Sequence, residues 1–544
     1  MTPPLLELRE AVQAAAATVR GDGEAPAQTR VERPKRDNQG DYSTNVAMLL
    51  APALGAPPRE IAARVGNELA QSLSAELASW EIAGPGFLNL TLSDDWYRRA
   101  TRIVLEAGDR YGAGAVERPE RVLIEFVSAN PTGPLVAANG QAAAYGDALA
   151  RILEHWGHHV HREYYFNDAG GQIRLLGESV LARARGGQIP EGGYQGEYVS
   201  DLAETIPGVE AMTVEEAARA AVEILLRQVK ATLERYRVHY DRFFSERTLY
   251  EGSPSYLDRA LEIVAEGGNS YRSDGALWLR TTNFGDDKDR VLERADGAPT
   301  YLAADLAYLL EKQERGVERQ LLPVGADHHG YVARMKAASA ALGEDPDRLE
   351  MPILQFVHLV EGSERAAMSK RRGEFIRLDD LLDEIGVDAT RYFMLQRSHD
   401  RTVDLDLDLA KRQDRENPVY YIQYAHARIV TMLGKLSPER VAAALAPDAD
   451  WGDAELHPAE RALIKTLASF PDEVAEAAIR RGPHRIAAYA LELAQEFTAF
   501  YRDCKVVGVE PESVESFRIA LSQSARQTIA LSLGLLGVSV PDSM

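Results

Sequence analysis

The stretch of sequence that decides the fold runs from Arg121 to Tyr165 and reads RVLIEFVSANPTGPLVAANGQAAAYGDALARILEHWGHHVHREYY. Residues 121–127 form an apolar run rich in β-branched and aromatic side chains, which is typical of a buried parallel strand. A loop with prolines and a glycine follows, residues 141–156 show a helical pattern, and residues 160–165 predict a second strand. This order predicts a βαβ unit with a right-handed crossover in a parallel sheet.

The flanking segments predict two further units. Before the βαβ unit, residues 61–73 show apolar side chains at helical spacing and residues 82–92 predict a short strand. After it, strand patterns resume at residues 321–324 and 353–360, and the chain from Asn417 onward carries only helical patterns. We expect an α/β fold class with an α+β domain over residues 1–112, a parallel-sheet domain over 113–400 with an insertion at about 172–290, and an all-α helical bundle over 401–544.

The composition is that of a soluble, multidomain globular protein. The chain has 544 residues, of which 45% are hydrophobic and 26% charged, and this balance excludes disorder and a disulfide scaffold. Its one cysteine, Cys504, has no internal partner, which favours a reducing, cytoplasmic location. No stretch approaches the roughly 20 apolar residues that cross a bilayer, and we expect no membrane partner. The net charge of −22 argues against non-specific nucleic-acid coating but leaves room for a groove that binds one particular RNA.

The first predicted ligand site is the loop after the first strand of the sheet. In doubly wound sheets, ligands bind at the carboxyl ends of strands, against the amino end of the following helix. Glu125 interrupts the apolar strand just before this loop, and Asp305 follows PTYLAA at the start of another predicted helix. Two carboxylates in one cleft would bind a guanidinium in a bidentate manner. The alternative is that each carboxylate braces an arginine of the protein itself.

Two later loops carry candidate nucleotide contacts. GADHHGY, residues 325–331, lies between a predicted strand and a predicted helix, and nucleotide contact explains its histidines better than a metal site does. In EGSERAAMSKRRGEF, residues 361–375, the cations from Lys370 to Arg372 would neutralise phosphates while Ser369 donates a hydrogen bond. A solvated charged surface is the alternative for the second loop. The histidines between His155 and His161 are interpreted as surface residues rather than metal ligands.

The helical region contains one candidate RNA-binding face. In YYIQYAHARI, residues 420–429, Tyr420, Tyr424 and Arg428 follow one another at intervals of four along a helix. Aromatic and basic side chains together stack on unpaired RNA bases. The alternative is an amphipathic core helix.

Taken together, these segments resemble the arginyl-tRNA synthetases, a class I aminoacyl-tRNA synthetase family. The matching segments, in chain order, are DNQGDYSTN, GPGFLN, EFVSANPTGPL, REYYFNDAGGQI, PTYLAADLAY, GADHHGY, MSKRRGEF, NPVYYIQYAHARI and LGLLGV. The resemblance implies a Rossmann-type catalytic domain with an insertion, a helical anticodon-binding domain, and an N-terminal domain that contacts the corner of the tRNA. It implies arginine–tRNA ligase activity, in which arginine and ATP give arginyl-adenylate and the arginyl group passes to the 3′ end of arginine tRNA. Magnesium accompanies ATP as its counter-ion, no metal is bound tightly by the protein, and activation is expected to need bound tRNA.

The resemblance also assigns roles to individual residues. The arginine-binding residues that it implies are Glu125, Asn130, Tyr301 and Asp305. Those for ATP are Gly140, His328, His329 and Met368, and those for catalysis are Asn139, Ser369 and Lys370. Those for tRNA are Asn38, Tyr42, Tyr424 and Arg428.

The sequence departs from the family pattern in both nucleotide motifs. Where the class carries His-Ile-Gly-His, this chain reads Val136-Ala137-Ala138-Asn139, and Ala367 replaces the first lysine of the Lys-Met-Ser-Lys loop. Losing one preorganised donor costs roughly 10²–10³ in rate, so a replacement for the histidines is needed. Asn139 is expected to donate one hydrogen bond, with Gln141, Arg371 or Arg372 as the alternatives for others. Two functions therefore stand: a working arginine–tRNA ligase, or a synthetase-like paralogue that binds arginine, nucleotide or tRNA without efficient activation. A ligase for another amino acid is disfavoured by the acids suited to a guanidinium, and we expect a monomer.

Overall fold

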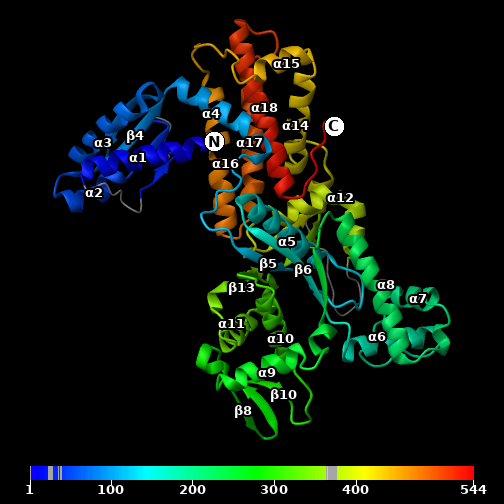
Figure 1. Cartoon of the computed structure of the whole chain (residues 1–544). Coiled ribbons are helices and arrows are strands. Elements are labelled where there is room, and N and C mark those ends of the chain that lie inside the picture. The colour runs from blue at the N-terminus through cyan, green and yellow to red at the C-terminus, as the bar shows by residue number, and fades with distance from the viewer. Residues whose placement is uncertain (1, 22–28, 35, 37–38, 363, 366–375) are drawn as a thin grey trace.

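The computed structural model describes residues 2–21, 29–34, 36, 39–362, 364–365 and 376–544. Figure 1 shows an N-terminal domain beside a helical bundle, with the central sheet below the bundle and two inserted pieces at the far end. The expected α/β class with its three parts is confirmed. No helix within the described ranges is long and apolar enough to cross a membrane.

The N-terminal domain is a four-stranded antiparallel sheet covered by helices. The strands lie in the order β1-β2-β4-β3, and Figure 1 shows α1 and α3 beside them. Residues 82–92, which were expected to form one strand, instead contain the end of β3, a turn and β4. Gly84 and Gly86 adopt positive φ and reverse the chain between these two strands. The elements are α1 (Pro4–Arg20), β1 (Val31–Glu32), β2 (Tyr42–Thr44), α2 (Val46–Leu54), α3 (Pro58–Leu73), β3 (Leu77–Ala83), β4 (Phe87–Leu92) and α4 (Asp94–Ala107).

The central sheet is parallel and has the doubly wound strand order. Its strands lie in the order β13-β11-β5-β6-β7, so the first strand in sequence, β5, lies in the middle and the order reverses between β5 and β11. Ligands bind at the carboxyl ends of the strands at such a reversal. The strands are β5 (Arg121–Glu125), β6 (His159–Phe166), β7 (Arg242–Ser245), β11 (Arg319–Leu321) and β13 (Leu349–Glu350), and α5 (Ala137–Trp156) is the crossover between β5 and β6. The predicted βαβ unit is confirmed.

The insertion differs from the expectation of one block at residues 172–290. β7 lies inside that range but is a strand of the central sheet, paired with β6. Its four residues, RFFS, are too few for an alternating or apolar pattern to identify. The inserted pieces are a helical one, α6 (Gly171–Ala184), α7 (Glu197–Thr205) and α8 (Val214–Arg235), and a mixed one, α9 (Tyr256–Glu266), β8 (Ser270–Ser273), β9 (Ala276–Leu279) and β10 (Arg290–Glu293).

The rest of the sheet domain completes the ligand side of the sheet. The strand expected at residues 353–360 is divided, because β14 pairs with β12 whereas β15 pairs with β16 and β17. The elements are α10 (Tyr301–Glu314), β12 (Val324–Gly325), α11 (Tyr331–Ala341), β14 (Ile353–Leu354), β15 (Val357–Glu361), β16 (Glu364–Arg365), α12 (Leu378–Leu395), β17 (Val403–Asp406) and α13 (Leu407–Lys411). The 3₁₀ turns span Ser74–Glu76, Gly108–Arg110, Val209–Ala211, Glu246–Tyr250, Thr281–Phe284, Ala326–His328 and Pro346–Arg348.

The C-terminal region is helical, as predicted. Prolines occupy the first turns of α14, α15 and α16, where a missing backbone N–H costs nothing. The helices are α14 (Pro418–Leu433), α15 (Pro438–Leu445), α16 (Pro458–Ile479), α17 (His484–Asp503) and α18 (Glu512–Leu535). They pack with α4 and α5 around one continuous apolar core, which joins the bundle to the sheet domain.

A glycine sets how closely α5 packs on β5. A Cβ at Gly146 would lie 2.2 Å from Cγ of Phe126, whose ring is 1% exposed and stacks on Tyr240 at 4.5 Å. We predict that Gly146→Ala lowers the free energy of unfolding by about 1–3 kcal/mol, because the enclosed ring has nowhere to move. The matched control is Gly534→Ala in α18, where a Cβ meets nothing within 4 Å and a small stabilisation is expected. Thermal denaturation of both variants checks this, and equal melting temperatures would contradict it.

Candidate active site

The candidate site begins at the carboxyl end of β5, where the backbone is strained. Val127 and Ser128 adopt φ of 67° and 41°, and such a value is a genuine outlier for the β-branched valine. The strained turn is fastened to β6, since the Tyr165 backbone N–H donates to Ser128 Oγ at 3.1 Å and the Tyr164 hydroxyl donates to the Ala129 carbonyl at 2.9 Å. These bonds direct the loop away from the sheet at the point where the strand order reverses.

A cavity of about 420 Å³ opens at this point and carries three acidic side chains. Glu125 ends β5, Glu246 follows β7, and Asp305 lies in the second turn of α10. Glu125 and Asp305, the two acids considered for one cleft on the basis of the sequence, thus line the same cavity. The remaining lining residues used below are Asn130, Tyr165, Tyr301, Tyr308, Lys312, His328 and Tyr331.

Asp305 has a strongly raised pKa. Burial is the main cause, and together with the charges of Glu125 and Glu246 it outweighs the hydrogen bond from the Tyr331 hydroxyl, so that the pKa of the carboxyl is raised to about 7. Among the described residues, neither Asp305 nor Glu246 has a lysine or arginine within ion-pair distance. The cavity therefore presents acids that lack cationic partners, which suits a cationic ligand.

Glu246 is a site residue that sequence reasoning missed. Its carboxylate is nearly buried and accepts hydrogen bonds from the hydroxyls of Tyr165, at 2.5 Å, and Tyr250, at 3.1 Å. The signal that would have found it is the same one that identified Glu125, an acid directly after a strand of the sheet. It went unrecognised because the short strand β7 was assigned to the insertion.

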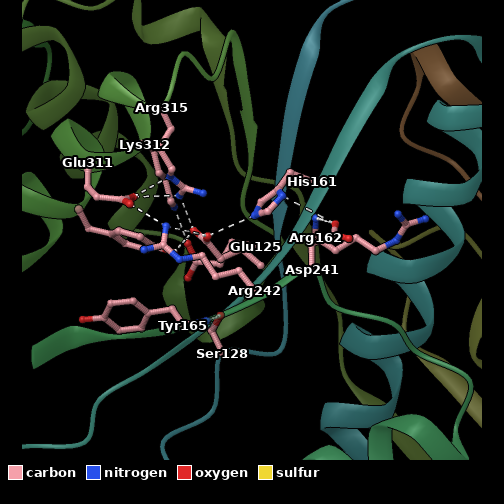
Figure 2. Close-up of polar contacts among 12 residues, drawn as sticks. Glu125, Ser128, His161, Arg162, Tyr165, Asp241, Arg242, Glu311, Lys312 and Arg315 are labelled. Carbon is pink, nitrogen blue, oxygen red and sulfur yellow. Dashed lines mark hydrogen bonds and ion pairs between the residues drawn. The ribbon is translucent and has the colours of Figure 1, made fainter. Parts of the chain in front are cut away.

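Glu125 is braced by the protein, but by a lysine rather than an arginine. Lys312 Nζ donates to Glu125 Oε2 at 2.5 Å, and the lysine side chain is only 1% exposed. Figure 2 shows this pair pointing together from α10 and β5. Both interpretations of Glu125 thus hold, since it faces the cavity and pairs with a cation of the chain.

A second group of charges lies behind the cavity and is balanced (Figure 2). Glu163 on β6 is fully buried and pairs with Arg315 at 2.8 Å, while Glu311 pairs with Arg315 at 2.9 Å and with Arg242 at 2.7 Å. Burial alone would raise the pKa of Glu163, but the interactions with His161, Arg315, Lys312 and Tyr308 outweigh it and lower the pKa to about 2. This group is a fixed support for α10 against the sheet.

A second cavity of about 450 Å³ adjoins the first. Asn130, Glu246 and Tyr301 line both, so they stand on the boundary between the two spaces. Asn130 is held there by Gln172, whose Oε1 accepts from its amide at 2.9 Å, and Tyr301 is 73% exposed at the start of α10. The predicted arginine-binding residues Glu125, Asn130, Tyr301 and Asp305 are therefore brought together in one place.

The predicted nucleotide residues lie in the first turn of α5, at the cavity, or outside the described residues. Asn139 closes the first turn of α5, its Oδ1 accepting from the Val136 backbone N–H at 2.9 Å. A Cβ at Gly140 would lie 2.7 Å from Leu378, so the glycine is fixed by packing. His328 lines the cavity, and His329 is exposed next to it. Met368, Ser369 and Lys370 lie outside the described residues.

The predicted tRNA residues divide into a buried one and an exposed pair. Tyr42 is 1% exposed and packs against Trp96 in the core of the N-terminal domain, so its ring offers no surface and the predicted contact is wrong for this side chain. Tyr424 is 39% exposed on α14, and the Arg428 guanidinium lies 4.6 Å from its ring centre. Asn38 lies outside the described residues. Within the part of the chain that is described, no set of three or more His, Cys, Asp or Glu side chains is arranged for a metal.

Comparison with protein-family models identifies the chain. Residues 6–92 match the arginyl tRNA synthetase N terminal domain, residues 208–413 the class I (R) tRNA synthetase catalytic domain, and residues 422–544 the DALR anticodon binding domain. An arginine–tRNA ligase of Frankia alni is 44% identical over 562 aligned residues, which cover 100% of both chains. The chain belongs to the arginyl-tRNA synthetase family. A second member, from Kineococcus radiotolerans, is 43% identical, again over 100% of both chains.

Solved arginyl-tRNA synthetases share the fold. The Thermus thermophilus structure has a TM-score of 0.76 at 25% identity and covers 99% of this chain and 100% of its own. The putative Campylobacter jejuni synthetase has a TM-score of 0.76 at 34% identity, covering 83% of this chain and 100% of its own. The three matched segments of the arginyl-tRNA synthetase family correspond to the N-terminal domain, the sheet domain and the helical bundle seen here.

Proposed function

We propose that this chain is an arginine–tRNA ligase, which activates arginine with ATP and transfers it to the 3′ end of arginine tRNA. The observation that carries the proposal is the acidic cavity at the strand reversal, where Glu125 and Asp305 face one space in a chain whose full-length relatives are named arginine–tRNA ligases. Arginine is the amino acid whose side chain matches paired carboxylates in this way.

In this proposal the substrate lies across the boundary between the two cavities. Asp305 and Glu125 bind the guanidinium, and Glu246 binds the α-ammonium group because it lines both cavities and lacks a cation among the described residues. Asn130 and Tyr301 hold the amino acid from the rim. The adjoining cavity receives the terminal adenosine of the tRNA, which must approach the arginyl carbonyl.

The nucleotide lies at the amino end of α5, where the helix dipole favours phosphate. The arginine carboxylate attacks the α-phosphorus of magnesium-bound ATP, and pyrophosphate leaves. A terminal hydroxyl of the tRNA then attacks the carbonyl carbon, and AMP leaves. Asn139 donates its side-chain amide to the phosphate, since its oxygen is used by the helix. Gly140, His328 and His329 line the nucleotide, and Met368, Ser369 and Lys370 are the remaining residues proposed to act on it.

The tRNA contact is proposed to include the exposed face of α14. Tyr420 and Tyr424 stack on one another with ring centres 6.2 Å apart, and Arg428 also lies 5.2 Å from the ring centre of Tyr501 on α17. Parallel rings flanked by a guanidinium provide a surface for unpaired bases. Asn38 of the N-terminal domain is the second proposed contact. We propose that the ligase acts as a cytoplasmic monomer, and light scattering tests the monomer.

The second candidate function is a synthetase-like binding protein. The observation that favours it is the segment from Val136 to Asn139, which carries neither histidine of the class pattern. Such a protein would bind arginine and tRNA and activate arginine poorly. Binding does not separate the two functions, whereas formation of the adenylate does.

The test is arginine-dependent exchange of pyrophosphate into ATP, with tRNA present, for the wild type and two variants of Asn139. Asn139→Ala removes the amide donor, and we predict a fall in exchange rate of roughly 10²–10³-fold. Asn139→Asp keeps the oxygen that accepts from Val136 and loses the donor, so it is predicted to be at least as impaired. If Asn139→Asp exchanged pyrophosphate at the wild-type rate, only the hydrogen bond that caps α5 would matter. If the wild type showed no exchange, the binding protein would be favoured.

A further inference from the structure

Lys312 is a buried amine on the cavity face of α10. Asp305, Tyr308 and Lys312 occur at intervals of three and four, which places them on one side of the helix, and all three line the acidic cavity. Only 1% of the lysine side chain is exposed. A buried ammonium group is costly unless it is paired, so its partner indicates what it is for.

The partner of Lys312 is a residue of the proposed arginine site. Its Nζ lies 2.5 Å from Glu125 Oε2 and 3.9 Å from the ring centre of Tyr308. The bond uses one oxygen of the Glu125 carboxylate and leaves Oε1 for another donor. A carboxylate held at one oxygen is also held in its orientation, so the amine decides where Glu125 points.

The charged group that does not line the cavity has guanidinium partners of its own. Glu163 and Glu311 are matched by Arg315 and Arg242 at distances between 2.7 and 3.7 Å, which makes two acids and two guanidinium groups. The charge of Lys312 also lowers the pKa of Glu163, but the hydrogen bond of Lys312 goes to Glu125 on the cavity side.

The charges that line the cavity add up to a definite surplus. Glu125, Glu246 and Asp305 are the acids among the described lining residues, and Lys312 is the one lysine or arginine among them. Once Asp305 is ionised, above its pKa of about 7, three acids and one amine leave a surplus of two negative charges. Free arginine carries two cationic groups, the guanidinium and the α-ammonium. With Lys312 in place, the cavity matches that pair of charges.

We propose that Lys312 is a positioning residue for the arginine substrate. It orients Glu125 through Oε2, and its positive charge leaves the cavity with two negative charges, which match the guanidinium and α-ammonium groups of arginine. The inference rests on the proposed function. It adds a residue that does not contact the substrate and acts through Glu125 and through its charge.

The proposed role of Lys312 predicts a specific pH dependence of arginine binding. The groups that face Asp305 are Glu125 on β5, Tyr165 on β6, Glu246 in the turn after β7, Tyr301, Tyr308 and Lys312 on α10, His328 before α11, and Tyr331 on α11. Among them, the charge of Lys312 lowers the pKa of Asp305. Since the guanidinium prefers the ionised carboxylate, arginine binding weakens as the pH falls through this pKa. Removing the amine moves the weakening to higher pH.

The experiment compares the full-length wild type with Lys312→Met and Lys312→Arg, measuring KM for arginine and kcat in tRNA charging between about pH 6 and pH 8.5. For Lys312→Met we expect a KM at least about tenfold higher at pH 7, with the pH dependence displaced upward by about one unit or more. Lys312→Arg keeps the charge and is expected to keep the wild-type pH dependence. The matched control is Arg242→Met, which removes a nearby cation that does not line the cavity and is expected to leave the profile unchanged.

The outcomes distinguish a failure of the role of Lys312 from a failure of the proposed ligase function. If Lys312→Met lowers kcat equally at every pH and leaves the KM profile where it is, the lysine is only structural and the inference is overturned. A displaced profile in Arg242→Met would also overturn it. If the wild type does not charge arginine, the proposed function fails, and calorimetric titration of arginine into the same variants over the same pH range decides the role of Lys312. A variant that does not fold is replaced by Lys312→Gln, for which the same displacement is expected.

Discussion

Asp305→Asn is expected to lower kcat/KM for arginine by roughly 10²–10⁴-fold while leaving tRNA affinity unchanged. The variant keeps an oxygen that accepts the hydrogen bond from Tyr331 but loses the charge that faces the guanidinium. Breaking a buried, hydrogen-bonded charge pair costs about 3–5 kcal/mol, which sets that range. Steady-state charging and a filter-binding titration with tRNA measure the two quantities. Unchanged arginine kinetics would contradict the role of Asp305.

The same substitution is expected to stabilise the protein without ligand. The pKa of Asp305 is raised from its ordinary value of 3.8 to about 7, so the folded state holds the proton more tightly than the unfolded state. Ionisation of this carboxyl therefore lowers the free energy of unfolding progressively from about pH 4 to pH 7, by at most about 4 kcal/mol. The asparagine side chain does not ionise, so Asp305→Asn should melt at a higher temperature than the wild type at about pH 8 but not at about pH 4. A lower melting temperature of the variant at the higher pH would contradict this account.

Arg391→Leu is expected to lower the free energy of unfolding by about 3–5 kcal/mol, with a fall in melting temperature of about 5–10 °C. Arg391 on α12 is fully buried, and its Nη2 lies 2.5 Å from Asp147 on α5. It also donates to the carbonyls of Leu536 at 2.8 Å and Tyr236 at 2.9 Å, so one guanidinium fastens α5, the end of α8 and the end of α18. Leucine leaves the Asp147 carboxylate without its buried partner.

The control for this variant is Arg412→Leu, which removes exposed pairs with Asp414 and Glu416. Exposed pairs contribute at most about 1 kcal/mol, so a small change is expected. Thermal denaturation, with light scattering to detect aggregates, compares the two variants. Equal losses would contradict the fastening role of Arg391. Because Asp147 lies on the helix whose amino end is proposed to bind the nucleotide, Arg391→Leu is also expected to reduce charging.

The parts of the fold that the sequence predicted are those set by local patterns. The apolar strand at residues 121–125 and the small-residue helix after it each satisfy a single periodicity, and parallel pairing follows from their order. The shared cavity of Glu125 and Asp305 was predictable because the end of a strand and the start of a helix that leads into the next strand lie at the same edge of a parallel sheet. β7 was not, since four residues carry too little pattern.

The missed site residues depend on contacts far away in sequence. Lys312 lies in EKQERG, which reads as the exposed end of a helix, and only the approach of β5 buries it against Glu125. Tyr42 lies in the polar segment DNQGDYSTN, but its place in β2 turns its ring inward onto Trp96. Asn139 reads as a donor to a ligand, while the structure also uses its oxygen to cap α5.

The central claim is that the acidic cavity and the altered nucleotide loop together charge tRNA with arginine. The measurement that tests it most directly is attachment of labelled arginine to an arginine tRNA transcript by the full-length chain with ATP and magnesium. The account predicts turnover of about one per second or faster, dependent on all three substrates. Bound arginine and bound tRNA with no charged product would contradict it, and would show a protein that keeps the binding cavity of its family without the chemistry.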